Sequence, residues 1–414
     1  MSHKSLAWLG TFPSHWDVMP NKALIKKVKR PVKVGSELPQ LLSLTKQGVI
    51  VRNLEEGGKF PENFDTYQIV KPGDLVTCLF DVPETPRTIG ISWYHGMITG
   101  AYDVFEFTDR IHPKYFEYVY LYLDDKKALS CFYTGLRNVI RTPTFMSIPT
   151  PVPPLEEQRA IADYLDSQIS KFSKTKASAE ALSAQIKQHL QSSVYHFTRG
   201  GIPAEGEENK QHLDWVGEFP NHWKKVPNKA LIQKKKVPVD IEKPLPKLLS
   251  LGRSGVVVRD LEAGGKFPTN FETYQVVQPG DLVMCLFDVP ETPRTIGIAT
   301  EMGMITSAYD VFEFRGEILP EFFLHFYTSL DDRKDLSMFY TGLRNVIRTP
   351  TFLSILTPVP PLEEQMRICG AIRELKAKSE PLDGIAATLG QLLDERVKSL
   401  VAEVVMGRAR ILEI

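Results

Sequence analysis

Hydrophobic and polar residues form two kinds of pattern along this chain. The first kind predicts short strands and short helices. The apolar run at 75–80 follows the turn Pro72-Gly73-Asp74 and predicts a buried strand, and residues 102–107 predict a second strand. The aromatic residues from 115 to 123 have the spacing of a short helix. Short strands and helices separated by turns predict a compact domain of the α/β (α+β) class.

The second kind of pattern predicts a long amphipathic helix. It follows Pro149, Pro151, Pro153 and Pro154, which stop any preceding helix, and it starts with two acidic residues. From Leu155 to about Phe197 there is no Pro or Gly, and apolar residues recur every three, four or seven positions, at Ile161, Leu165, Ile169, Phe172, Ala179, Leu182 and Ile186. So long a helix needs a partner to cover its apolar stripe.

The same pattern occurs twice, with an offset of 207 residues. Trp8 matches Trp215, Asp81 matches Asp288, and Pro154 matches Pro361. Residues 41–107 and 248–314 align over 67 positions without a gap and differ at 16 of them. The chain therefore contains two copies of one domain, and the period is far longer than the roughly 20 to 50 residues of a solenoid repeat.

The second copy supplies the partner helix. From Leu362 to about Val405 its apolar positions are Ile368, Ile372, Leu375, Leu382, Leu389, Leu392 and Leu393, and Pro381, Gly384 and Gly390 predict a kink or a break. We expect the helices to pair as an antiparallel coiled coil, which would relate the domains by a pseudo-two-fold axis. Such symmetry suits the reading of two similar half-sites on duplex DNA. The predicted boundaries are 1–152 for the first domain, 153–199 for the central helix, 200–212 for a linker, 213–359 for the second domain and 360–414 for the C-terminal helix.

Composition narrows the possible functions. Lys and Arg together number 50, as do Asp and Glu, so any binding to nucleic acid must come from a local surface. No stretch approaches 18 apolar residues, so we expect a cytoplasmic protein that does not enter membranes. The four cysteines have no C-x-x-C pair or neighbouring His cluster, and we expect them to be small buried residues, at Cys78, Cys131, Cys285 and Cys369.

Catalytic signatures are absent from the sequence. The Gly57-Gly58-Lys59 step does not fit a phosphate-binding loop, and there is no G-x-G-x-x-G, H-E-x-x-H, G-x-S-x-G or methyltransferase tetrapeptide. We therefore predict that the chain is not an enzyme and holds no cofactor or metal. Residues 80–87 combine two carboxylates with Arg87, which acid–base chemistry could use, but a Pro-stiffened loop with a salt bridge is the favoured interpretation.

The segment TGLRNVIRT at 134–142 recurs unchanged at 341–349 and has residues suited to DNA contact. Arg can bridge guanine O6 and N7, Asn can pair with adenine, and Thr hydroxyls reach phosphates. The candidate DNA-binding residues are therefore Arg137, Asn138, Arg141, Thr142, Arg344, Asn345, Arg348 and Thr349. The alternative is a solvated turn whose arginines pair with Asp124 and Asp125.

Further candidates lie elsewhere in each copy. Arg87 and Arg294 each follow a proline, Pro86 and Pro293. Lys46 and Arg253 lie where the copies differ, at 45–47 against 252–254, and a second difference separates 92–95 from 299–302. We expect any asymmetry of DNA readout to arise at these differences. Lysine-rich segments could hold phosphates or be ordinary solvated faces, at Lys22, Lys26, Lys27, Lys29, Arg30 and Lys33 and at Lys224, Lys225, Lys229, Lys234, Lys235 and Lys236.

These features together resemble one family, the DNA-specificity subunits of type I restriction-modification systems. The resemblance covers nearly the whole chain, and three motifs that each occur twice carry it: Leu41-Leu42-Ser43-Leu44, Pro72-Gly73-Asp74 and Pro153-Pro154-Leu155-Glu156-Glu157-Gln158. It implies two target-recognition domains that each read half of a bipartite DNA site, spaced by a coiled coil.

The resemblance also implies partners, namely two methyltransferase subunits that use S-adenosylmethionine and, in a full complex, restriction and translocation subunits that use ATP and Mg. Because the two domains nearly coincide, we predict a nearly palindromic interrupted site. The neutral charge predicts weak DNA binding by the isolated chain. Two alternatives remain open: a tandem-domain protein-interaction scaffold, and an enzyme that cuts or methylates DNA by itself.

Overall fold

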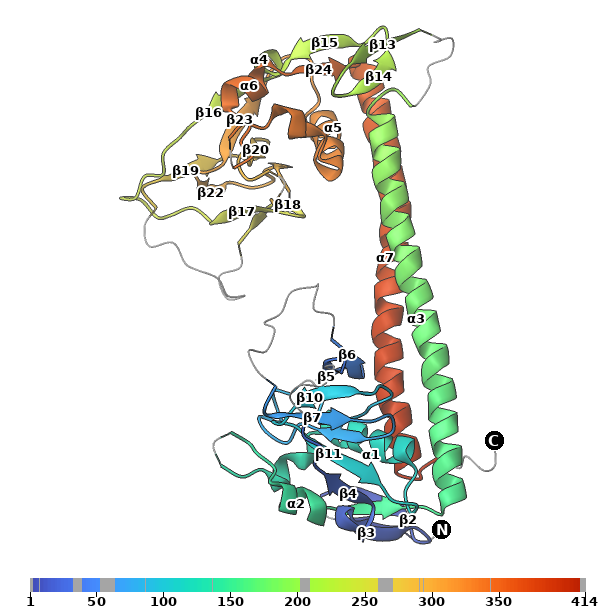
Figure 1. The fold of residues 1–414 in the computed structure, drawn as a ribbon. Helices are drawn as coiled ribbons and strands as arrows, with labels where there is room; N and C mark the ends of the chain where they lie inside the picture. The colour runs from blue at the N-terminus through green and yellow to red at the C-terminus, as the bar shows by residue number, and fades with distance from the viewer. Residues whose placement is uncertain are drawn as a thin grey trace. The chain divides into compact units, whose positions relative to one another are not determined.

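The computed structural model describes residues 3–6, 8–32, 39–52, 64–85, 87–135, 137–201, 209–259, 271–289, 291–292, 294–342 and 344–409. The chain divides into two compact units, which we call unit 1 (Met1–Glu180 and Thr388–Ile414) and unit 2 (Ala181–Ala387). Each unit contains one of the repeated domains, the half of a long helix that adjoins it in sequence, and half of the other long helix (Figure 1).

The domain of unit 1 is built on a four-stranded antiparallel sheet of order β4-β11-β8-β9. Its strands are β4 (Ile25–Val28), β11 (Asp103–Phe107), β8 (Leu75–Thr77) and β9 (Ile89–Ile91). Smaller two-stranded sheets surround it: β1 (His3–Leu6) with β2 (Gly10–Pro13), β3 (Asp17–Pro20) with β12 (Pro149–Val152), β5 (Leu42–Thr45) with β6 (Gly48–Val51), and β7 (Tyr67–Val70) with β10 (Gly96–Thr99). The two predicted strands are confirmed as β8, which is fully buried, and β11.

Helix α1 (Pro113–Asp125) packs against β9 of this sheet and confirms the predicted aromatic helix. Proline at its first position fits a helix start, because the missing N–H would be unpaired there. Its buried face, which includes Phe116 and Tyr120, joins Trp16 and Phe145 in one hydrophobic core. The remaining short helices of unit 1 are η1 (Asn21–Ala23), η2 (Ala128–Phe132) and α2 (Thr142–Ser147).

Unit 2 repeats this architecture with a four-stranded sheet of order β16-β23-β20-β21. Its strands are β13 (Lys210–Leu213), β14 (Gly217–Pro220), β15 (Lys224–Pro227), β16 (Ile232–Lys235), β17 (Leu249–Gly252), β18 (Gly255–Val258), β19 (Tyr274–Val277), β20 (Leu282–Met284), β21 (Ile296–Ile298), β22 (Gly303–Thr306), β23 (Asp310–Phe314) and β24 (Leu356–Val359). Its short helices are α4 (Asn228–Leu231), α5 (Pro320–Arg333), η3 (Asp335–Phe339) and α6 (Thr349–Ser354). Strand β13 lies partly within the segment 200–212 that was expected to be a linker, and residues 202–208 of that segment lie outside the described residues.

The long helices are α3 (Leu155–Phe197) and α7 (Leu362–Val405). In unit 1, Ile161 and Leu165 pack in one core with Leu400 and Val404, and Lys176 forms an ion pair with Asp394 at 2.6 Å. In unit 2, the Ser183 hydroxyl bonds to Asp383, while Val194 packs in one core with Ile368 and Ile372. Within each unit, rising numbers on α3 meet falling numbers on α7, so the helices pair antiparallel as predicted.

The predicted break in α7 is wrong, because the helix continues through Pro381, Gly384 and Gly390 (Figure 1). Proline removes one helical hydrogen bond and clashes with the preceding turn, which costs about 3 kcal/mol. Contacts on both sides of Pro381 hold the helix across it: Ser379 is buried before it, and Asp383 bonds to Ser183 and Lys187 of α3 after it.

Two other expectations about burial also fail. Cys131 is exposed, because η2 turns it towards solvent, whereas the other three cysteines are buried as expected. Leu182, Leu382 and Leu392 are about half exposed, although their spacing had placed them on the apolar stripes. The helix seam instead buries small residues such as Ala179 and Ala386.

The described part of the chain offers no helix that is long and apolar enough to cross a membrane. Within the same residues, no group of three or more His, Cys, Asp or Glu side chains is arranged to hold a metal ion.

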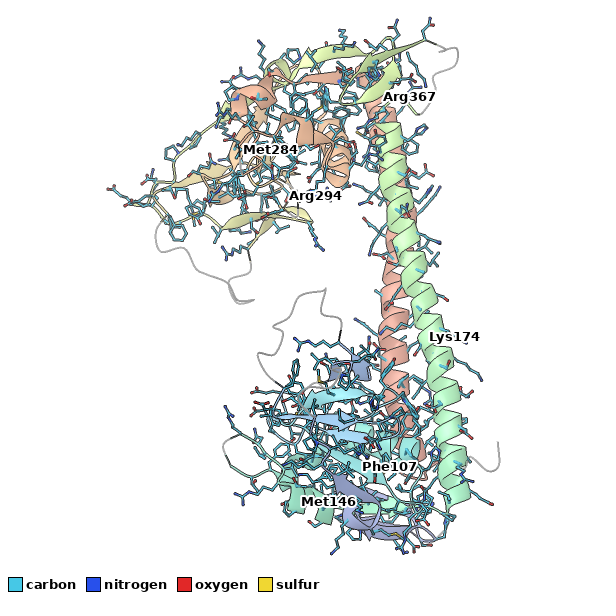
Figure 2. The ribbon with its side chains drawn as sticks, in the orientation of Figure 1. Phe107, Met146, Lys174, Met284, Arg294 and Arg367 are labelled. Atoms are coloured by element: carbon cyan, nitrogen blue, oxygen red, sulfur yellow. The ribbon has the colours of Figure 1, made fainter. Side chains whose placement is uncertain are left out.

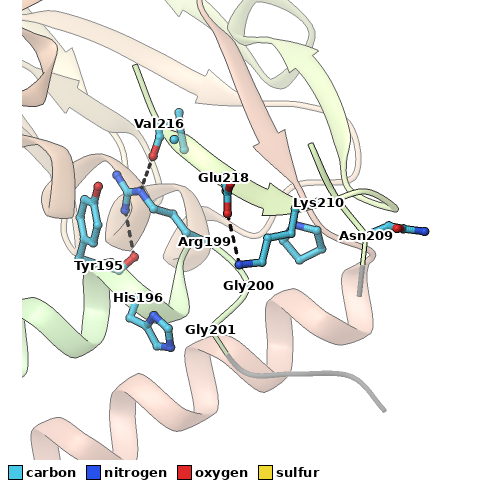
Figure 3. Close-up of a pocket in the computed structure, with 11 residues that line it drawn as sticks. Tyr195, His196, Arg199, Gly200, Gly201, Asn209, Lys210, Val216 and Glu218 are labelled. Atoms are coloured by element: carbon cyan, nitrogen blue, oxygen red, sulfur yellow. Dashed lines mark hydrogen bonds and ion pairs between the residues drawn. The ribbon is translucent and has the colours of Figure 1, made fainter. Parts of the chain in front are cut away.

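The end of α3 is locked to unit 2 by a buried arginine (Figure 3). The Arg199 guanidinium stacks on the Tyr195 ring at 3.4 Å and donates to the carbonyls of Val216 at 3.1 Å and Tyr195 at 3.0 Å. Burial lowers its pKa to about 10. Gly200, with φ of +85°, ends the helix, and a cavity of about 390 Å³ lies beside this turn.

Candidate nucleic-acid interface

The loop between η2 and α2 carries the predicted DNA-binding segment of unit 1. Gly135 and Asn138 both have positive φ, and Thr134 pairs with Val139 across the turn. The Arg137 carbonyl accepts a hydrogen bond from the Asp81 backbone N–H at 3.1 Å. This bond fixes the backbone of the loop to a neighbouring turn, while the side chains of Arg137, Asn138 and Arg141 are exposed.

Unit 2 builds the same loop with the same bonds. Gly342 and Asn345 have positive φ, and the Arg344 carbonyl accepts from the Asp288 backbone N–H at 3.0 Å. Arg344, Asn345 and Arg348 are again exposed. Leu136 and Leu343 lie outside the described residues. In Figure 1, α2 lies on the side of the unit 1 domain opposite the helix pair, so this loop is accessible from outside the unit.

The arginines of this loop do not form the salt bridges that the alternative interpretation required. Asp124 accepts hydrogen bonds from the Thr88 N–H at 2.9 Å and the Thr88 hydroxyl at 2.5 Å, and burial raises its pKa. Asp125 pairs with Lys398 at 3.2 Å. Among the described residues, Arg137 and Arg141 make no ion pair, so both guanidinium groups are available to a ligand.

The threonines at the start of α2 and α6 are differently placed. The Thr142 hydroxyl donates to Asp103 at 2.6 Å, and Lys27 lies 2.6 Å from the same carboxylate. Thr349 bonds in the same way to Asp310, which pairs with Lys234. These hydroxyls therefore hold the loop in place, and the paired lysines Lys27 and Lys234 remain about half exposed, at 46% and 44%.

The two remaining arginine candidates do not join the loop. The Arg87 guanidinium lies 2.7 Å from Glu117 of α1, and both side chains are almost buried, at 10% and 7% exposed. Arg294 lies beside α5 in unit 2 and pairs with Asp332 at 2.7 Å (Figure 2). Pro86 and Pro293, which precede these arginines, lie outside the described residues.

Arg87 and Lys46 instead line a second feature, a cavity of about 860 Å³ between the domain of unit 1 and its part of the helix pair. Trp93, Lys114 and Glu117 line the same cavity, and residues 134–142 do not. The sequence reasoning did not identify Lys114 and Glu117. Extending the comparison of the two copies to α1 could have found them, because their counterparts are Glu321 and Leu324.

The remaining basic candidates lie in the turns where the two copies differ and in the lysine-rich segments, and some of them are exposed while others form ion pairs. Lys46 and Arg253 are exposed at the β5–β6 and β17–β18 turns. Arg30 is held by Asp74 and Glu106, and Lys235 by Asp281 at 2.9 Å. Lys33 lies outside the described residues. Part of the positive charge of these segments is therefore already balanced by carboxylates of the same unit.

Comparison with known proteins agrees with this architecture. Residues 82–188 match the family model of the type I restriction modification DNA specificity domain. A chain solved in work on complex assembly and conformational transition of the type I R-M system aligns with a TM-score of 0.68 at 12% identity, covering 96% of this chain and 99% of that one. The HsdS subunit from Thermoanaerobacter tengcongensis aligns with a TM-score of 0.51 at 13% identity, covering 96% and 98%. No curated protein matches the sequence.

These matches define the class first: a mixed α/β chain with two tandem domains, each followed by a long helix of an antiparallel pair. The predicted resemblance to the DNA-specificity subunits of type I restriction-modification systems is confirmed, by sequence over residues 82–188 and by fold over nearly the whole chain.

Proposed function

We propose that this chain is the DNA-specificity subunit of a type I restriction-modification complex and that it reads a bipartite, nearly palindromic, interrupted DNA site. The observation that carries the proposal is the exposed Arg-Asn-Arg loop, which has the same sequence and the same backbone bonds in both units. Two equal sets of donors favour two similar half-sites.

In this proposal Arg137 and Arg141 contact guanine O6 and N7, and Asn138 contacts adenine. Their counterparts in unit 2 read the second half-site. Lys27 and Lys234, which are about half exposed, exchange Asp103 and Asp310 for phosphates and set the register without reading sequence. The fixed loop backbone supports this assignment, because base readout needs donors that are held in place before binding.

The chain itself performs no catalytic step in this proposal. It directs two methyltransferase subunits, which use S-adenosylmethionine, to the site, and in a full complex it also directs restriction and translocation subunits that use ATP and Mg. Because Lys and Arg only balance Asp and Glu, the isolated chain binds DNA weakly and in a salt-sensitive way. Partner subunits supply the remaining phosphate contacts.

Sequence selection from a random duplex library tests the proposal. The chain is co-purified with its methyltransferase partner, and selected duplexes are identified by adenine methylation. We expect an interrupted inverted repeat. Absence of any enriched sequence would favour the scaffold, selection of a site with unrelated halves would contradict the near-palindrome, and methylation or cleavage by the chain free of partners would reveal an enzyme.

A further inference from the structure

The cavity of unit 1 contains a buried ion pair that unit 2 cannot form. Arg87 Nη2 lies 2.7 Å from Glu117 Oε1, Arg87 Nη1 lies against Gly48 of the β5–β6 turn, and Arg87 Nε is buried without a hydrogen-bond partner among the described residues. Glu117 also pairs with Lys114 at 3.0 Å and accepts from the Ile91 N–H at 3.3 Å. Arg87 is therefore held between the turn and α1.

Unit 2 has the same arginine without the same acid. Leu324 replaces Glu117 and Glu321 replaces Lys114, although residues 288–298 repeat 81–91 without a change. Arg294 turns to the end of α5, where it lies 2.7 Å from Asp332 and 3.8 Å from Asp331, and its side chain is 20% exposed. Among the described residues, no atom lies within 4 Å of the position that a Cβ would occupy at Gly255, the counterpart of Gly48.

The two ion pairs differ in how easily DNA can replace them. Separating the Arg87–Glu117 pair is unfavourable, because it leaves a carboxylate that is 7% exposed with only Lys114 as an ion-pair partner among the described residues. Separating the Arg294–Asp332 pair costs less, because both side chains are more exposed than their unit 1 counterparts, at 20% and 21%, and water reaches the freed Asp332 carboxylate more easily. A guanine therefore competes more easily with Asp332 for Arg294 than with Glu117 for Arg87.

We propose that Glu117 is a specificity-determining residue, because it retains Arg87 inside unit 1 and so leaves Arg294 alone to contact a guanine. The nearly palindromic site then has one asymmetric position, at which the half-site read by unit 2 requires guanine and the other half-site does not. Glu117 acts through Arg87 as a positioning residue. This inference rests on the proposed DNA-specificity function.

The test compares DNA selected by the wild-type complex with methyltransferase and by complexes carrying Glu117→Leu or Arg87→Met/Glu117→Leu. Glu117→Leu gives unit 1 the side chain of unit 2 and frees Arg87. We expect the first half-site to gain a guanine at the position that mirrors the Arg294 contact, with a preference of about 5- to 150-fold over other bases. The double variant removes the freed arginine, so it should select the wild-type site.

Arg294→Ala should remove the guanine preference from the other half-site, and Glu84→Leu, at an exposed acid of the same loop, is a control that should select the wild-type site. If Glu117→Leu does not fold, Leu324→Glu tests the same idea in reverse, since it should retain Arg294 and remove its guanine. Selection of an unchanged site by Glu117→Leu or Leu324→Glu would overturn this inference alone. Failure of the wild-type complex to select any sequence would overturn the proposed function as well.

Discussion

The two units share one fold but differ in the side chain that packs after the end of a long helix, which is charged in unit 2 and apolar in unit 1. In unit 2, Arg199 lies just after the last turn of α3, where it stacks on Tyr195 and donates hydrogen bonds to backbone carbonyls and to the Ser329 hydroxyl. In unit 1 the matching residue at the end of α7 is Met406, which is 2% exposed in the hydrophobic core. Both helices then turn at a glycine with positive φ, Gly200 or Gly407, packed against a proline.

Arg199 and Met406 therefore fill equivalent spaces with long side chains. The residues around each space determine whether a charged or an apolar side chain is accommodated. Around Arg199, Tyr195 provides a ring and Ser329 a hydroxyl, and at the matching positions unit 1 has Ala402 and Tyr122. Arg199 therefore has carbonyl and hydroxyl acceptors, but its Nη2 has no hydrogen-bond partner among the described residues. A charged group is tolerated here because of these neighbours.

Exchanging the two side chains should give the largest effect. Met406→Arg places a guanidinium in the hydrophobic core of unit 1 without the Tyr195 ring and the Ser329 hydroxyl that unit 2 provides, so we expect a loss of about 3 to 5 kcal/mol in the free energy of unfolding. Urea unfolding of the full chain measures the loss, and hydrogen exchange assigns it to unit 1.

The reverse exchange is the matched control. Arg199→Met removes a buried charge and fills the space with the residue that unit 1 uses, so the free energy of unfolding should change by less than about 1 kcal/mol. A loss from Arg199→Met as large as that from Met406→Arg would show that the bonds of Arg199 hold unit 2 together.

The sequence alone predicted the elements whose signal is local. The helix from Leu155 to Phe197 has the predicted ends, because prolines precede it and glycines follow it. The continuity of α7 could not be predicted, because Pro381 is tolerated through contacts with a helix about 200 residues earlier. The Arg87–Glu117 pair likewise joins residues 30 positions apart through a sheet and a helix, and no local pattern indicates it.

Pro381 gives a second way to test the units against each other, because its counterpart in α3 is Lys174, which projects from that helix in Figure 2. Pro381 is exposed, so its ring contributes little packing. Pro381→Ala restores a backbone hydrogen bond, and we expect it to raise the free energy of unfolding by up to about 3 kcal/mol. Thermal and urea unfolding measure the gain.

Lys174→Ala is the matched control and should change stability by less than about 0.5 kcal/mol. Lys174→Pro should instead destabilise α3, because nothing there has adapted to a missing N–H. If Pro381→Ala brought no gain, the helix pair would already compensate fully for the proline.

Tyr118 in unit 1 and His325 in unit 2 occupy equivalent positions, and lowering the pH should reduce the free energy of unfolding through His325 but not through Tyr118. The Tyr118 hydroxyl of α1 bonds to Asp166, whereas burial, with Lys376 and Arg373 nearby, lowers the pKa of His325 to about 3, and Glu321 lies 3.6 Å from its Nε2. Between pH 6.5 and about 3 the unfolded chain then binds a proton at His325 that the folded chain does not. The stability from this site is complete above pH 6.5 and falls by about 1.4 kcal/mol per pH unit as the pH drops.

His325→Phe removes this titration, so its stability relative to wild type should rise by about 2 to 3 kcal/mol between pH 7 and pH 4.5. The measurement is urea unfolding of both proteins across this range, and Tyr118→Phe in unit 1 serves as a comparison whose effect should not vary with pH. Parallel pH profiles for wild type and His325→Phe would mean that His325 becomes protonated in the folded chain.

The smallest expected effect concerns DNA and separates the two units by function. Arg137→Ala removes one exposed guanidinium from unit 1 and leaves Arg344 in unit 2 unchanged, so one half-site should relax at one position by about 1 to 3 kcal/mol of base discrimination. Arg344→Ala should relax the mirrored position of the other half-site. Because the loop backbone donates and accepts through main-chain atoms, neither change should alter the fold. Methylation of a panel of singly substituted duplexes measures both effects. If Arg137→Ala left both half-sites unchanged, this loop would not be the reading surface, and equal relaxation of both halves would mean that one loop serves the whole site.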